Sequence, residues 1–143
     1  MGDAMALYLR NDVSRSVIRH ASETFPEECC GFLIGEDGGD RMTMEAQRAR
    51  NSATESKGSR YVIDPLEIMK CERESASRGL RVLGYYHSHP DHPSIPSEFD
   101  RQNAWPGYSY LIVSVISGHP SGMRSWRLTD DRSRFVREEL FYE

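Results

Sequence analysis

The chain has 143 residues, of which 38% are hydrophobic, and this length and composition are typical of one compact domain that buries its own core. Lysine and arginine number 18 against 22 acidic residues, which gives a formal net charge of −4. This acidic balance argues against nucleic acid or an anionic membrane surface as the partner, so we expect a protein or a small molecule. The sequence predicts a single domain over residues 1–143.

The three cysteines, Cys29, Cys30 and Cys71, do not form a paired framework. Two of them are neighbours in sequence, and neighbouring cysteines rarely bridge because the geometry is strained. No basic segment followed by an apolar run occurs near residue 1, and no stretch reaches the roughly 20 apolar residues of a membrane span. We therefore expect a protein of the reducing cytoplasm with no membrane anchor.

The first third of the sequence predicts a helix followed by a strand hairpin. Residues 14–25 carry apolar side chains at helical spacing and end before Pro26, which cannot continue a helix. The short apolar run over residues 29–35 predicts a buried strand, and the glycines at 38 and 39 predict the turn after it. Residues 41–51 would form the antiparallel partner.

A further strand over residues 59–63 should lead into a second helix. Asp64 can cap that helix and Pro65 fits its first position, and we expect it to end near Gly79. Its predicted apolar face is thin, so the helix should lie on a sheet with a broad solvated side. This face consists of Leu66, Met69 and Ala76.

The second half of the sequence predicts mostly strands. In chain order we expect a strand (80–86), a loop (90–96), a short helix (97–104) and three strands (108–117, 122–128 and 135–142). Residues 108–117 are the most apolar and β-branched of these segments, so we expect that strand at the centre of the sheet. The predicted fold class is α/β, with a mixed central β-sheet flanked by helices.

Candidate metal ligands follow the predicted strand over residues 80–86. His87 and His89 are two residues apart, so both imidazoles would project from the same face of an extended chain. Asp100 lies three residues after Ser97 on the predicted short helix, which places the two on one helical face. Two imidazoles and one carboxylate suit a catalytic zinc ion, which needs three protein ligands and an open position for water.

Two more residues are candidates for the chemistry of such a centre. Glu28 directly precedes the apolar strand over residues 29–35 and is the candidate general base, because a proton acceptor is needed for the attacking water. Ser97 is the candidate hydrogen-bond donor to the developing oxyanion. The sequence therefore predicts a zinc-dependent hydrolase of amide or isopeptide bonds.

These residues resemble the motif of the JAMM (MPN+/Mov34) metalloproteases, which reads Glu-x-Cys-Gly, then His-Ser/Thr-His, seven residues, Ser, two residues and Asp. Glu28 opens the first part, His87 and His89 form the second, and Ser97 and Asp100 follow at the required spacing. The resemblance spans nearly the whole chain. It implies Glu28 as base and proton shuttle, Ser97 as oxyanion stabiliser, the other three residues as Zn²⁺ ligands, and a cytidine-deaminase-like α/β/α core.

The loop that begins Pro90, Asp91, His92, Pro93 resembles the short bacterial branch of that family, whose members process ubiquitin-like sulfur-carrier proteins. This resemblance implies hydrolysis at the C-terminal tail of such a carrier. It leaves open whether the scissile bond joins the tail to cysteine, to lysine or to further C-terminal residues. The carrier, the pathway, the oligomeric state and the metal used in the cell also stay open, since Fe²⁺ or Mn²⁺ can occupy similar ligands.

Two other functions compete with this one. The fold could serve as a non-catalytic interaction module, although the complete ligand set argues against that. A metal-dependent hydrolase or deaminase of a small amide would use similar chemistry, but the His-x-Glu and Pro-Cys-x-x-Cys signals of zinc deaminases are missing. Among the remaining residues, we expect Cys30 to be a buried packing residue, His92 to lie on the loop surface or substrate rim, and His20 and His119 to face solvent.

Overall fold

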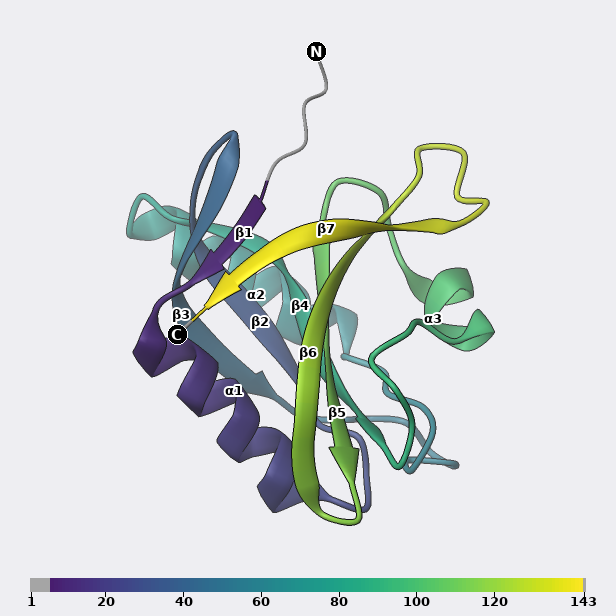
Figure 1. Cartoon of the computed structure of the whole chain (residues 1–143). Helices are drawn as coiled ribbons and strands as arrows, with labels where there is room; N and C mark the ends of the chain where they lie inside the picture. Colours follow the sequence, from purple (N-terminus) through teal and green to yellow (C-terminus); the bar gives the residue numbers. More distant parts are fainter. Residues whose placement is uncertain (1–5, 143) are drawn as a thin grey trace.

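The computed structural model describes residues 6–142, and the strands in this range form one closed sheet (Figure 1). Around the sheet the order is β1, β3, β2, β4, β5, β6, β7. The strands are β1 (Ala6–Leu9), β2 (Cys30–Gly38), β3 (Asp40–Ala49), β4 (Arg81–Pro90), β5 (Ser109–Ile116), β6 (His119–Leu128) and β7 (Phe135–Tyr142). The helices are α1 (Asn11–Thr24), α2 (Pro65–Ser77) and α3 (Glu98–Asn103).

The sheet is mixed, as expected, but it closes on itself. β4 pairs in parallel with β5, whereas β2 pairs antiparallel with both β3 and β4. Closure comes from β1, which pairs in parallel with β3 on one side and with β7 on the other. The expected layered sheet is therefore corrected to a barrel, because a four-residue strand that the sequence analysis did not predict joins its two edges.

Successive side chains of the central strands pack alternately into two hydrophobic clusters. Tyr86 is fully buried in the cluster that includes Val17 of α1, and Tyr85 lies in the cluster that includes Cys71 of α2. The alternation follows from strand geometry, since successive side chains point to opposite faces. The three cysteines are free and buried, which confirms Cys30 as a packing residue.

The helices differ from prediction in their details. α1 begins at Asn11, three residues earlier than expected. α2 begins as predicted, because the side chain of Asp64 accepts a hydrogen bond from the Leu66 backbone N–H at 2.8 Å. The predicted apolar face of α2 is wrong: Leu66 is 71% exposed and Met69 48%, whereas Cys71 and Ser75 are buried against the sheet. No helix within residues 6–142 is both long and apolar enough to cross a bilayer.

Residues 59–63 do not form the strand expected from their sequence. The segment runs beside residues 51–52 without regular pairing. The Val62 carbonyl accepts hydrogen bonds from the N–H and the hydroxyl of Ser52, and the Val62 N–H donates to the side-chain oxygen of Asn51.

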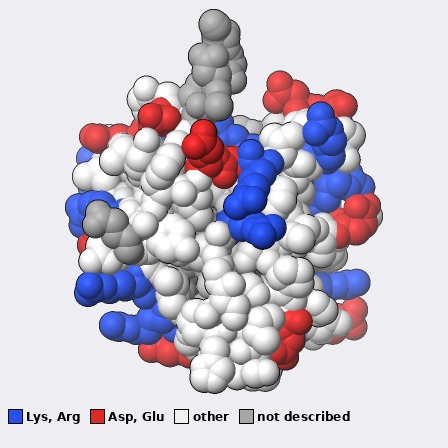
Figure 2. Space-filling model, in the orientation of Figure 1, with Lys and Arg blue, Asp and Glu red and all other residues white. Residues whose placement is uncertain are grey.

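On the face that carries β1 and β7, basic and acidic residues are interspersed, with no large area of one sign (Figure 2).

We predict that Gly84→Ala destabilises the protein by about 1–3 kcal/mol, the usual cost of overpacking a core. Gly84 lies in β4 where a Cβ would overlap the backbone of Ser109 in β5, so the parallel pair that carries the histidines would have to separate. Urea unfolding measures the effect. Gly38→Ala is the matched control, since a Cβ there meets no atom within 4 Å, and equal stability of the two variants would contradict the prediction.

Candidate functional site

Strand β4 brings His87 and His89 to one buried face of the sheet. The strand continues to Pro90, so both histidines lie within the ladder rather than in the loop after it. His87 is paired with Cys30 of β2 and Ile112 of β5, and His89 with Ser114 of β5. Their side chains are 1% and 7% exposed. Because β4 is held on both sides, the spacing of the two imidazoles is fixed by the backbone.

Asp100 reaches the same site from α3, a helix of only six residues. Such a short helix is unstable alone and depends on its cap. The hydroxyl oxygen of Ser97 accepts a hydrogen bond from the Asp100 backbone N–H at 3.0 Å, and the Ser97 N–H donates to Asp100 Oδ2 at 2.9 Å. This reciprocal capping box orients the Asp100 carboxylate toward β4.

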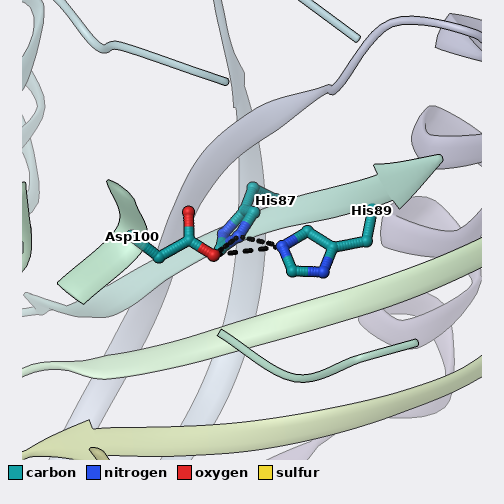
Figure 3. Close-up of side chains that lie close together, drawn as sticks. All are labelled: His87, His89 and Asp100. Atoms are coloured by element: carbon teal, nitrogen blue, oxygen red, sulfur yellow. Dashed lines mark hydrogen bonds and ion pairs between the residues drawn. The ribbon is translucent and has the colours of Figure 1, made fainter. Parts of the chain in front are cut away.

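The three side chains converge on one point (Figure 3). Asp100 Oδ2 lies 3.2 Å from His87 Nε2 and 3.0 Å from His89 Nε2, and the two Nε2 atoms are 3.2 Å apart. For ligands about 2.0–2.1 Å from a tetrahedral zinc ion, neighbouring ligand atoms lie about 3.3 Å apart. The triangle therefore has the size that such an ion requires.

The hydrogen bond of the second ring nitrogen of His89 indicates that a positive charge belongs between His89 and Asp100. Nδ1 lies 2.9 Å from the carbonyl oxygen of Pro93, which can only accept, so Nδ1 carries a proton. A neutral imidazole then directs the lone pair of Nε2 at an Asp100 carboxylate oxygen. Two electron-rich atoms at 3.0 Å need a proton or a metal cation between them.

The electrostatics agree with this geometry. Burial would raise the pKa of Asp100, but in the metal-free protein the charge of His87 and protons donated by both histidines and by the Ser97 N–H hold that pKa well below its usual range. Burial likewise opposes protonation of His89, but Asp100 and the Pro93 carbonyl raise its pKa. The site thus keeps a carboxylate ionised in a buried position and attracts positive charge to it.

Glu28 is held beside this centre by its backbone. Its N–H donates to the Lys57 carbonyl at 2.7 Å, and the next residue, Cys29, donates to Ser88 Oγ of β4 at 2.8 Å. The Glu28 side chain is buried and its Oε1 has no hydrogen-bond partner among the described residues. Burial raises the pKa of Glu28 to about 7, with His87 and His89 opposing the shift and Asp100 adding to it.

All five predicted residues therefore meet in one region. His87, His89 and Asp100 form the triangle, while Glu28 and Ser97 line an open cleft together with His89. His92 lies on the rim of the same cleft, as one of its two expected positions.

The family known as prokaryotic homologs of the JAB domain matches residues 10–129 of the chain. The desampylase of Haloferax volcanii is 39% identical over 113 residues, which cover 76% of this chain and 80% of that protein. The chain belongs to the prokaryotic JAB-domain family. This result confirms the family resemblance drawn from the motif.

Two further comparisons agree with membership of the JAB family over most of the chain. The CysO-cysteine peptidase of Mycobacterium tuberculosis is 29% identical over 130 residues, which cover 90% of this chain and 87% of that protein. A solved structure of protein DSY2949 from Desulfitobacterium hafniense is similar with a TM-score of 0.82 and 28% identity, over 96% of this chain and 92% of that one.

Two neighbours of the site in this JAB-family chain were missed by the sequence analysis. Tyr61 stacks on His87 with ring centroids 4.4 Å apart, and Asn51 hydrogen-bonds the Glu28 carbonyl at 3.2 Å. Both contacts join segments far apart in sequence, and Tyr61 was assigned to a strand that does not form. No pattern in the neighbouring sequence identifies either residue as part of the site.

His20 was expected to face solvent, and this prediction is wrong. It is 7% exposed in α1, and its Nδ1 lies 2.7 Å from the hydroxyl of Tyr86, the residue before His87. Helix α1 turns this residue inward because it lies one turn after Val17 and beside Ala21, which are fully buried. Burial lowers the pKa of His20 to about 4, with Arg48 adding to the shift and Glu23 opposing it.

We predict that this buried imidazole makes the protein less stable as the pH falls. Because the folded-state pKa is below the unfolded value of about 6.5, the unfolded chain binds the proton first, and stability is lost as the pH falls from 6.5 toward 4. Between pH 7.5 and 5.0, the wild type should lose about 2 kcal/mol more unfolding free energy than His20→Gln. Identical pH dependence in the two proteins would contradict this assignment.

Proposed function

We propose that this JAB-family protein is a zinc-dependent hydrolase that cuts a peptide or isopeptide bond at the C-terminal tail of a ubiquitin-like sulfur-carrier protein. The main support is the buried triangle of two imidazole nitrogens and one carboxylate oxygen, each about 3 Å from the other two. In this proposal His87, His89 and Asp100 hold the ion. A buried carboxylate and two converging imidazoles have no comparable structural purpose, since a packed apolar core would be more stable.

The remaining residues have roles set by their positions. A zinc ion held by the triangle supplies a Lewis acid for the scissile carbonyl and acidifies a water molecule near neutral pH. Glu28 accepts a proton at Oε1, which has no hydrogen-bond partner in the described part of the chain, and returns it to the leaving amine. Burial raises the pKa of Glu28, so its carboxyl group holds a proton more readily than an exposed one, and this suits an acid–base catalyst.

Ser97 is proposed to stabilise the oxyanion. Its hydroxyl oxygen already accepts the Asp100 N–H, so the hydroxyl proton remains available for donation into the cleft that Ser97 shares with Glu28. The serine therefore combines two functions, since it caps the helix that carries Asp100 and faces the position of the reacting carbonyl.

The proposed substrate class rests on the relatives and on the shape of the cleft. One relative is named a desampylase and another a CysO-cysteine peptidase. The cleft is open and bordered by Pro93 and Ile95, so an extended chain can lie along it. We propose that the carrier tail binds in this form through main-chain hydrogen bonds, and that two terminal glycines bring the scissile carbonyl close to Glu28.

Metal-loaded protein, assayed with a sulfur-carrier fusion that ends in Gly-Gly before the cleaved bond, tests the function. We expect about one zinc per chain and cleavage after the second glycine, lost on replacement of the glycines by bulky residues. Glu28→Gln should keep the metal and lower kcat by at least about 100-fold. Glu27→Gln is the matched control, since the adjacent Glu27 is exposed. If zinc-loaded wild type cleaved no fusion faster than His87→Ala does, the catalytic function would be abandoned in favour of a binding module.

Ser97 should show two separable effects. Ser97→Ala is expected to destabilise the protein by about 1 kcal/mol through loss of the cap, and to lower kcat about 100-fold at saturating zinc through loss of an oxyanion donor. Ser97→Thr keeps the hydroxyl and should restore most of both. A Ser97→Ala variant with reduced stability but normal kcat would show that the serine only caps the helix.

A further inference from the structure

The two histidines of the triangle are supported differently. His89 has its second ring nitrogen hydrogen-bonded to the Pro93 carbonyl, whereas Nδ1 of His87 is buried and has no hydrogen-bond partner within residues 6–142. Histidines that bind metals usually donate their second N–H to an acceptor, which fixes the tautomer and the ring orientation. Something other than a hydrogen bond must therefore orient the His87 ring.

Tyr61 lies where that support is needed. Its ring covers the His87 imidazole with centroids 4.4 Å apart and an angle of 24° between the planes, so the two rings are stacked. The tyrosine is partly buried and also packs against the cluster that contains Ile63 and Tyr110. It is therefore fixed by the core on one side and limits rotation of the His87 ring on the other.

The backbone around Tyr61 is fixed by one side chain. Asn51 Nδ2 donates to the carbonyl of Arg60 at 3.0 Å, and Asn51 Oδ1 accepts from the N–H of Val62 at 3.1 Å. The peptide groups on both sides of Tyr61 are thus bound to the same amide. The same Nδ2 also donates to the carbonyl of Glu28. Asn51 therefore binds both the backbone around Tyr61 and the backbone of the proposed base.

We propose that Tyr61 is the positioning residue of His87: its stacked ring holds the imidazole in the orientation that binds metal, in place of a hydrogen bond to Nδ1, which no residue from 6 to 142 provides. The inference rests on the metal site of the proposed function. Tyr61 acts through His87 and has no part in proton transfer, so the ring carries the effect and the hydroxyl group does not.

Zinc affinity, measured by competition with a chromogenic chelator, tests the proposal without any substrate. Tyr61→Ala and Tyr61→Leu should bind zinc about 10–100-fold more weakly, the usual loss when the support of a ligand is removed. Tyr61→Phe keeps the ring and should stay within about threefold of wild type. Tyr108→Ala is the matched control, because Tyr108 is a partly buried tyrosine whose ring packs at an angle of 54° against Tyr85 rather than on His87.

A second measurement reports on the ring itself. Long-range proton–nitrogen NMR spectra of the zinc-loaded protein should show one tautomer of His87 in wild type and Tyr61→Phe, and a broadened or mixed signal in Tyr61→Leu. Leucine fills much of the space of the ring, so this variant remains informative if Tyr61→Ala unfolds.

The outcomes separate this inference from the function on which it rests. Wild type that binds no zinc would overturn both. Tight zinc binding by wild type together with unchanged affinity in Tyr61→Leu would overturn only the role of Tyr61. A loss in Tyr61→Phe as large as in Tyr61→Leu would also overturn it, because the hydroxyl and not the stacked ring would then be responsible.

Discussion

A carboxylate oxygen buried between two imidazole nitrogens is unfavourable unless positive charge lies among them, and this constraint explains most of the structure around it. Asp100 is 6% exposed, and its Oδ2 lies within 3.2 Å of both histidines. Removing an ionised carboxylate from water costs several kcal/mol unless it is paired and hydrogen-bonded. The Ser97 N–H provides one hydrogen bond, and the remaining compensation comes from positive charge among the three side chains, either a proton on an imidazole or a metal cation.

The surrounding fold keeps these atoms together. Strand β4 lies between β2 and β5 and so cannot shift to relax the distance between its two histidines. Ser88, between those histidines, binds the backbone of Cys29 through both its hydroxyl and its N–H, and this fixes Glu28 relative to the triangle. Closure of the sheet by β1 then leaves no free edge along which the pairing could slip.

What the sequence could predict is what depends on local geometry. The convergence of His87 and His89 follows from strand alternation, and the direction of Asp100 follows from the capping box with Ser97, so both are encoded within a few residues. The closure by β1 could not be predicted, because a four-residue segment carries too little pattern and its two partners lie far along the chain. The contacts of Tyr61 with His87 and of His20 with Tyr86 join segments 26 and 66 residues apart in the same way. Helix α2 shows a different limit, since Leu66 and Met69 are apolar yet exposed, and hydrophobicity alone does not say which face a helix buries.

X-ray absorption at the zinc edge of the metal-loaded protein tests the central claim most directly. The account predicts one zinc site with two imidazole ligands and oxygen ligands, at about 2.0–2.2 Å from the metal. A spectrum without imidazole scattering, or with sulfur at about 2.3 Å from a cysteine thiolate, would contradict it.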